Sequence, residues 1–138
     1  MEKLSNTQMK SLDEWLFNYK DVSKQIAIRK LELQTDNPNT DCNIGGGRAN
    51  RINKVTEDIV AKWDSDGRIK SYENFKDSVE RLRSILDDEL NEVFKLRWEH
   101  SSCRTWEEIA DTLHVSIKSV YRKRERILTL FALEMGLI

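Results

Sequence analysis

The sequence predicts an all-α protein: an N-terminal amphipathic helix, a flexible Gly-rich loop, and a helical bundle that ends in a helix-turn-helix. Two observations carry this prediction. Apolar residues recur at three- and four-residue steps through most of the chain, whereas the alternation typical of a β-strand persists nowhere. The 138 residues also include five Gly and one Pro, so few helix-breaking positions interrupt these periods.

The first predicted helix runs from Thr7 to Gln34. Its apolar residues form one stripe, which consists of Met9, Leu12, Leu16, Tyr19, Val22, Ile26 and Leu33. The next segment, Thr35–Asn50, contains Pro38 and three consecutive glycines, and we predict a loop with free backbone rotation. We place a boundary there, so that residues 1–50 hold the helix and the loop, and residues 51–138 form a second helical domain.

Two further helices are predicted before the helix-turn-helix. The first begins near Ile52 and ends at a turn over Asp64–Gly67. The second runs from about Ser71 to Trp98, with a bend expected near Asp87–Asp88. Their apolar stripes are Ile52, Val55, Ile59 and Trp63 in the first, and Phe75, Val79, Leu82, Leu86, Leu90, Val93 and Phe94 in the second.

The segment Thr105–Leu128 has the spacing of a helix-turn-helix. Thr105 is predicted to begin the first helix through a capping box with Glu108. The short connection is His114–Val115, and Ser116 caps the second helix. The inward-facing residues are small or apolar, namely Ile109, Ala110, Leu113, Val120, Ile127 and Leu128. In such a unit the second helix lies in the major groove with its N-terminal residues towards the base edges.

Basic charge is concentrated in this second helix. The chain has a net charge of −1, but residues 116–126 contain five basic residues and one acid, so the remaining residues sum to about −5. This asymmetry is expected when one face meets phosphates and the rest does not. The basic residues are Lys118, Arg122, Lys123, Arg124 and Arg126.

We therefore predict that the partner of this helix is double-stranded DNA; the competing interpretation is a surface helix with solvated charges. Lys and Arg can donate to guanine, and Ile can meet a thymine methyl group. Phosphate contacts fix the register but read no sequence. The residues predicted for base edges are Ile117, Lys118, Ser119 and Arg122, and those for phosphates are Arg104, Tyr121 and Arg126; Thr105, Ser116 and Lys123 complete the predicted site.

Two positions depart from the common helix-turn-helix pattern. Lys123 stands where an aliphatic residue is usual, and its stem could pack while its ammonium reaches solvent. His114 stands where glycine is common. Either His114 takes a left-handed conformation or the turn differs slightly.

The run Leu86-x-x-Glu89-x-x-Glu92-Val93-Phe94-Lys95-Leu96-Arg97-Trp98, followed by Thr105–Leu128, resembles region 4 of sigma factors. With Asp41-Cys42-Asn43-Ile44-Gly45-Gly46-Gly47-Arg48-Ala49-Asn50 upstream, the whole chain resembles the RinA/ArpU-type phage transcriptional regulators. The resemblance implies an activator of late or packaging genes that binds promoter DNA in the bacterial host cytoplasm and acts with host RNA polymerase. The alternative is a small-terminase-like subunit that recognises DNA for packaging, although such subunits usually place the helix-turn-helix first.

An acidic edge lies on the first helix of the motif, at Glu107, Glu108 and Asp111. Acids early in a helix are explained by the helix dipole. The sharper hypothesis is that they contact host RNA polymerase. The apolar tail Leu128, Phe131, Met135, Leu137 and Ile138 could pack against the N-terminal helix in one chain or pair two copies as a homodimer.

Other residue groups favour neither an enzyme nor a bound metal or cofactor. The three glycines are followed by Arg48 and not by the Gly-Lys-Ser of a phosphate loop, so a hinge is expected, with Arg48 and Arg51 as candidates for a DNA-backbone contact. His100 and Cys103 alone do not make a metal site. Apolar runs fall short of the roughly 20 residues that span a bilayer, so no membrane contact is expected.

Overall fold

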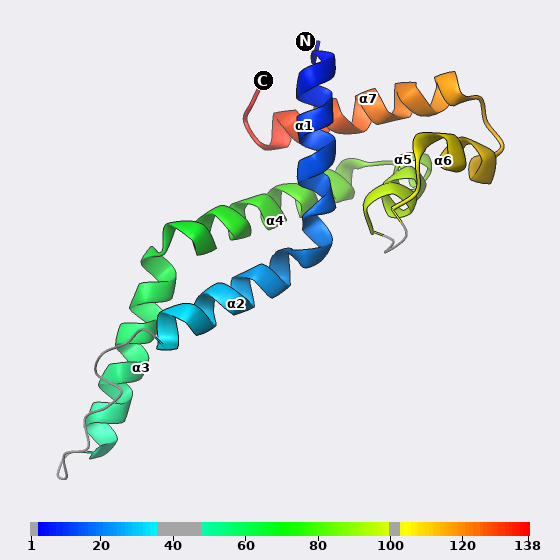
Figure 1. Ribbon diagram of the computed structural model, residues 1–138. Coiled ribbons are helices and arrows are strands. Elements are labelled where there is room, and N and C mark those ends of the chain that lie inside the picture. Colours follow the sequence, from blue (N-terminus) through cyan, green and yellow to red (C-terminus); the bar gives the residue numbers. More distant parts are fainter. Residues whose placement is uncertain (1–2, 36–47, 100–102) are drawn as a thin grey trace. The chain divides into compact units, whose positions relative to one another are not determined.

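The computed structural model describes residues 3–35, 48–99 and 103–138, and these residues form helices without any strand (Figure 1). The all-α prediction is confirmed. In chain order the elements are α1 (Asn6–Phe17), η1, a 3-10 turn (Tyr19–Asp21), α2 (Val22–Thr35), α3 (Arg48–Ser65), α4 (Gly67–Ile85), α5 (Asp88–Phe94), η3, a π-helical turn (Lys95–Glu99), α6 (Trp106–Leu113) and α7 (Ile117–Glu134). None of the helices in these ranges has both the length and the apolar character that crossing a membrane requires.

The chain forms two compact units. The first consists of Met1–Asp21 and Phe75–Ile138, and the second of Val22–Asn74. This division differs from the boundary predicted near residue 50, because α1 packs with the C-terminal part of the chain, namely α7 and η3. Most of the predicted Gly-rich loop, residues 36–47, lies outside the described residues, and its last three residues, 48–50, are the first of α3.

α1 begins at Ser5 with a capping box. The Gln8 backbone N–H donates to the Ser5 hydroxyl at 3.1 Å, and the Ser5 backbone N–H donates to the Gln8 side-chain oxygen at 2.8 Å. The helix ends at Asn18, so the continuous helix predicted from Thr7 to Gln34 is wrong. The ring of Tyr19, the next residue, packs edge-on against Phe94 at 6.2 Å between centroids, which gives the chain a tertiary reason to turn here.

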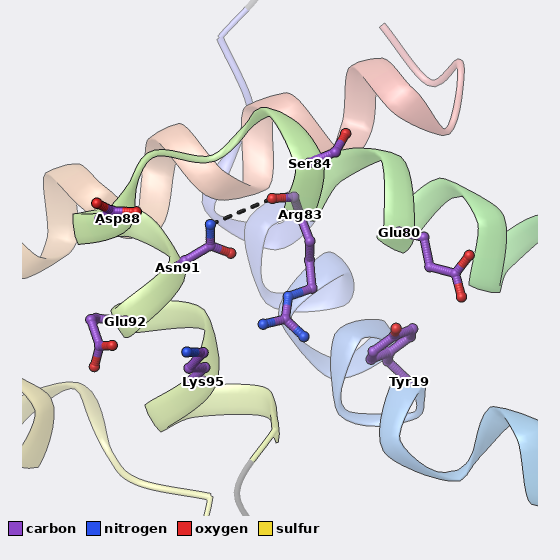
Figure 2. Close-up of a pocket in the computed structure, with 8 residues that line it drawn as sticks. All are labelled: Tyr19, Glu80, Arg83, Ser84, Asp88, Asn91, Glu92 and Lys95. Carbon is purple, nitrogen blue, oxygen red and sulfur yellow. Dashed lines mark hydrogen bonds between the residues drawn. The ribbon is translucent and has the colours of Figure 1, made fainter.

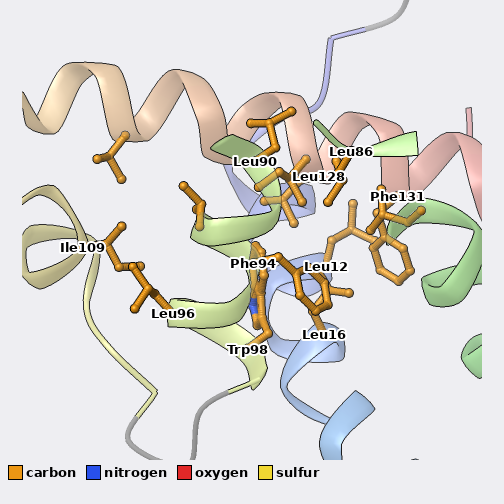
Figure 3. Packing of buried hydrophobic residues seen from close by; sticks show 14 of the residues in the cluster. Leu12, Leu16, Leu86, Leu90, Phe94, Leu96, Trp98, Ile109, Leu128 and Phe131 are labelled. Atoms are coloured by element: carbon orange, nitrogen blue, oxygen red, sulfur yellow. The ribbon is translucent and has the colours of Figure 1, made fainter. Parts of the chain in front are cut away.

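The first unit has one hydrophobic core, to which α1, α4, α5, η3, α6 and α7 contribute (Figure 3). Leu12 and Leu16 of α1 meet Leu128 and Phe131 of α7 in this core. Its aromatic centre is a row of rings in which Trp98 lies 5.3 Å from Phe94 and 5.7 Å from Trp106. Of the apolar tail, Leu128 and Phe131 are fully buried and Met135 and Ile138 pack against the core, whereas Leu137 is 53% exposed.

The predicted helix Ser71–Trp98 is divided at the expected place. α4 ends at Ile85, and the Asp87 carboxylate accepts from the backbone N–H of Leu90 at 2.8 Å to start α5. The Asn91 amide donates to the carbonyl of Leu86 at 3.0 Å, which holds the two helices together across the bend.

In the second unit, α2 and α3 are joined by polar contacts around Trp63. Its indole N–H donates to the carbonyl of Lys30 at 3.2 Å, and the Lys30 ammonium lies 5.1 Å from the centre of its ring. Arg29 donates to both carboxylate oxygens of Asp66, at 2.9 and 3.1 Å. Asp66 also accepts from the backbone N–H of Ile69 and so begins α4 at Gly67, the last residue of the predicted turn. The hydrogen bond from Arg29 is the main cause that lowers the pKa of Asp66.

Candidate nucleic-acid interface

The predicted two helices and the turn between them are present as α6 and α7. The Thr105 hydroxyl accepts from the Glu108 backbone N–H at 3.2 Å, and the Ser116 hydroxyl accepts from the Ser119 backbone N–H at 3.2 Å. Both predicted caps are therefore confirmed. Between Thr105 and Glu108, however, the structure shows one half of the expected capping box. α7 extends to Glu134, beyond Leu128, where the predicted helix-turn-helix segment ends.

His114 resolves the question that the sequence left open at the turn. Its backbone is left-handed, with φ 57° and ψ 43°. The Val115 N–H donates to the Ala110 carbonyl at 3.1 Å and the His114 N–H to the Asp111 carbonyl at 3.3 Å. These two bonds are those of a Schellman motif, which normally has glycine at the left-handed position. The turn therefore has the usual geometry on an unusual residue.

Buried apolar residues hold α6 against α7. Ile109, Val120, Ile127 and Leu128 are fully buried, and the small residue Ala110 is 6% exposed. A substitution in this layer would disturb the mutual placement of the two helices, because a close-packed interior does not adjust freely to lost volume. Packing thus fixes which side of α7 faces away from the core.

The side of α7 that faces solvent carries most of the predicted DNA contacts. Ile117 and Tyr121 are 38% and 42% exposed, so two large side chains of this side are open to solvent. Lys118, Arg122 and Arg126 are exposed as well, and Ser119 is half-buried. We call the exposed residues Ile117, Lys118, Tyr121, Arg122 and Arg126 the α7 face.

Two other predicted DNA contacts are engaged within the protein. The Lys123 ammonium lies 3.3 Å from the Glu89 carboxylate, and its side chain is 16% exposed. Its stem is thus largely covered, as expected, but its charge is paired with an acid of α5. The Arg104 guanidinium donates to the Thr112 hydroxyl at 2.8 Å, beside α6. Lys123 therefore belongs to the packing of α7 and not to the α7 face.

Arg124, the remaining basic residue of α7, lies over the ring of Trp106 with its guanidinium carbon 5.6 Å from the centroid. The guanidinium of Arg97 lies 4.7 Å from the same centroid. Arg97 in turn donates to both carboxylate oxygens of Asp13, at 2.8 and 3.2 Å, and the Trp98 indole N–H donates to Asp13 at 3.0 Å. A polar network therefore ties α1 to the start of α6 and the middle of α7.

The three acids of α6, Glu107, Glu108 and Asp111, are all exposed. Within the described part of the chain, their carboxylates take part in no ion pair. Glu107 and Glu108 lie in the first turn of α6, where the helix dipole favours negative charge. The acidic edge thus lies at the surface, as the sequence predicts.

A groove of mixed charge lies on α4 and α5, with Tyr19 at one end (Figure 2). Its charged residues are Glu80, Arg83, Asp88, Glu92 and Lys95. Arg83 is committed within the protein, because it pairs with Glu99 at 3.1 Å and stacks on Phe94 at 4.8 Å. Burial, followed by the charge of Glu80, raises the pKa of Tyr19. Three acids and two bases thus line this groove, and one of the bases, Arg83, is already paired, so the groove offers no cluster of free cations for DNA.

The histidine and cysteine candidates for a metal site lie only partly within the described residues. In residues 3–35, 48–99 and 103–138, no three His, Cys, Asp or Glu side chains are grouped as metal ligands would be. The Cys103 sulfur lies 3.2 Å from the Lys20 ammonium. His100 and Cys42 lie outside the described residues, as do the side chains of Arg48 and Arg51.

Sequence reasoning offered packing of the N-terminal helix against the apolar tail as one alternative, but it missed the polar contact that Asp13 of α1 makes with Arg97 and Trp98. Asp13 is 84 residues from Arg97 in the chain, and no local pattern links two residues so far apart. One signal was available, however. An acid at position 13 interrupts the apolar stripe beside Leu12, and an acid at the edge of a buried stripe is usually paired.

Comparison with known proteins adds a family and no function. No curated protein and no solved structure matches the chain. A family model described as "Protein of unknown function (DUF722)" matches residues 8–132, which run from α1 into α7 and include the whole of α6. Since this match covers most of the chain, the protein belongs to the family described as Protein of unknown function (DUF722).

Proposed function

We propose that this protein binds double-stranded DNA through the α7 face and regulates transcription. The observation that carries the proposal is the α7 face itself. Three cationic side chains and two large apolar ones are exposed on a helix whose opposite side is fully buried, at the exit of a tight turn from α6. The exposed Ile117 and Tyr121 add apolar and aromatic surface beside these cations, which suits contact with DNA better than charge alone.

The chemistry of the α7 face suits a major groove. Lys118 and Arg122 lie in the first two turns of α7, where the recognition helix of a helix-turn-helix approaches base edges. Arginine can donate two hydrogen bonds to O6 and N7 of guanine, and the apolar side chain of Ile117 can contact the methyl group of thymine. Tyr121 and Arg126 suit phosphates, which position the helix without reading sequence.

The resemblance to sigma region 4 and to RinA/ArpU-type regulators suggests the biological setting. On that basis, the protein is a phage activator of late or packaging genes that binds a promoter and acts with host RNA polymerase. The exposed acids of α6 are a candidate polymerase contact. They precede α7, the basic helix that would hold the DNA, and their negative charge makes them unsuited to bind DNA themselves.

Selection of bound sequences from a random duplex library tests sequence-specific binding. The wild type should enrich one motif, and Arg122→Ala should lower affinity for that motif by about 1–3 kcal/mol while changing affinity for unrelated DNA little. An equal loss on every sequence would make Arg122 a phosphate contact. Failure to enrich any motif would contradict sequence-specific binding.

Footprinting on phage DNA with purified host polymerase tests the regulatory role. Protection upstream of a late promoter, together with more transcript, supports activation. Protection at a packaging site without more transcript would favour the alternative, a packaging recognition subunit.

The polymerase contact has its own test. Glu108→Lys together with Asp111→Lys should abolish activation while DNA affinity stays at or above that of the wild type, because both changes add positive charge near DNA. Asp77→Lys and Glu80→Lys, on α4, form a control with the same change in net charge and should leave activation intact. Loss of DNA affinity in the α6 double variant would contradict the assignment.

A further inference from the structure

A second groove lies where α1 passes α7, next to the α7 face. Its volume is about 520 Å³. α1 contributes one wall, with Asn6, Met9, Lys10 and Asp13, and the other wall is formed by Trp106, Tyr121, Arg124 and Glu125. Tyr121 belongs to both the α7 face and this groove, so the two surfaces are continuous.

Some charged residues in this groove are paired within the protein, and others form no ion pair among the described residues. Asp13 is held by both Arg97 and Trp98, so its negative charge is already compensated. The Nε atom of Arg124 is buried and has no hydrogen-bond partner among the described residues. Lys10 is exposed and forms no ion pair within that part of the chain. The uncompensated cations are therefore Lys10 and Arg124, and Glu125 is the one acid without an ion pair in this lining.

We propose that α1 carries a second DNA contact, in which Lys10 and Asn6 bind the phosphate backbone beside the stretch that Tyr121 and Arg126 approach. This inference rests on the proposed function and extends the DNA-binding surface beyond α6 and α7. A backbone ligand fits better than a base, because Lys10 is a point charge on a flexible stem and Asn6 offers an amide donor. Charge and continuity with the α7 face both favour this occupant.

Removing the charge of Glu125 should change DNA affinity in the direction opposite to removing Lys10. A phosphate in the groove would be repelled by its carboxylate, so Glu125 should weaken DNA binding in the wild type. Removing a basic residue and removing an acidic residue from the same groove should therefore change affinity in opposite directions. If Lys10 acted only in folding, the two substitutions would not change affinity in opposite directions.

The test measures binding to a labelled duplex DNA of mixed sequence across a range of salt concentrations. Phosphate contacts are independent of sequence, so the operator is not needed. Lys10→Ala should lower affinity and reduce the slope of log affinity against log salt by about 1. Glu125→Gln should raise affinity by about threefold, the size of one screened surface charge interaction.

Two variants serve as controls. Lys95→Ala removes one lysine of the same unit from the groove on α4 and α5, and it should leave the slope almost unchanged. Arg126→Ala, at the phosphate contact proposed on the α7 face, should reduce the slope if the proposed function is right. Circular dichroism checks the fold of each variant, which alanine at exposed helix positions should preserve.

The outcomes separate the two proposals. If Arg126→Ala reduces the slope and Lys10→Ala matches Lys95→Ala, the contact through α1 is overturned and the proposed function stands. If Lys10→Ala lowers affinity and the slope as Arg126→Ala does, and Glu125→Gln raises affinity, the contact is supported. If the wild type shows no salt-dependent DNA binding, both proposals fall.

Discussion

Asp13 is the residue through which α1 is fixed to the rest of the first unit. Its side chain is 11% exposed and that of Arg97 is 15% exposed, and the pair is bidentate. Removing one member of a buried pair leaves the other charge uncompensated, which costs more than the pair itself contributes. The network around Asp13 should therefore respond strongly to a small chemical change.

Asp13→Asn should lower the free energy of unfolding by about 3 kcal/mol, because it keeps the shape of the side chain but leaves the Arg97 guanidinium without a carboxylate. Denaturant unfolding measures the change. Glu14→Gln, at the neighbouring exposed acid, is the matched control and should change stability by less than about 0.5 kcal/mol. Equal effects of the two substitutions would show that the Asp13–Arg97 pair does not stabilise the fold.

At the scale of elements, the turn between α6 and α7 holds a residue that does not suit its backbone. Left-handed φ costs a residue with a Cβ about 1 kcal/mol, and His114 is exposed, so packing does not repay this cost. The hydrogen bonds of the turn involve backbone atoms alone. The side chain can therefore change without loss of the turn.

His114→Gly should raise the free energy of unfolding by about 0.5–1 kcal/mol, since glycine adopts positive φ without strain, although its larger freedom in the unfolded chain offsets part of the gain. Thermal unfolding monitored by circular dichroism measures this change. His114→Ala keeps the Cβ and should bring no such gain. A less stable glycine variant would mean that the imidazole has a favourable contact after all.

The start of α4 should make the second unit sensitive to acid. The hydrogen bond from Arg29 lowers the pKa of Asp66 below its ordinary value of about 4, so the folded state binds the proton less tightly than the unfolded chain. The stabilisation is then fully present above pH 4 and is lost as pH falls through the lowered pKa.

Comparing the wild type with Asp66→Asn across this pH range tests the prediction. The wild type should be the more stable protein at neutral pH, and the difference should shrink as pH falls below 4. Trp63 fluorescence provides a probe within the second unit, because its indole packs against Lys30 of α2. A difference that stays constant with pH would contradict the role of the carboxylate charge.

At the scale of the whole molecule, one core joins the two ends of the chain. Leu16 of α1 is fully buried in the cluster that contains Leu128 and Phe131 of α7. The stability of the candidate DNA-binding helix therefore depends on residues more than 100 positions away. This dependence follows from long-range packing and not from the helix propensity of α7 itself.

Leu16→Ala should lower the free energy of unfolding by about 2–5 kcal/mol, through lost burial and a cavity. Hydrogen exchange of α7 amides should become faster as well, since α1 supports that helix. Leu31→Ala, at a leucine that is 60% exposed, is the control and should have little effect. Unchanged exchange in α7 would contradict the shared core.

Local features were predictable from the sequence. These features depend on interactions within a few positions of the chain. Ser, Thr or Asp at a helix start indicated the caps at Thr105 and Ser116 and the bend at Asp87, and the periodicity of apolar residues indicated the α6–α7 unit. The same is true of the concentration of basic charge in α7. The expectation of one long helix from Thr7 to Gln34 failed because its apolar stripe continues past Asn18, where the packing of Tyr19 on Phe94 turns the chain.

By itself, the sequence determined the all-α fold, the α6–α7 unit and the identity of α7 as the basic helix, since these follow from short-range periodicity and capping. The tertiary structure decided which of those basic residues are exposed. It pairs Lys123 with Glu89, stacks Arg124 on Trp106 and leaves Lys118, Arg122 and Arg126 at the surface. The physical reason is that burial and charge pairing depend on neighbours that folding alone brings together.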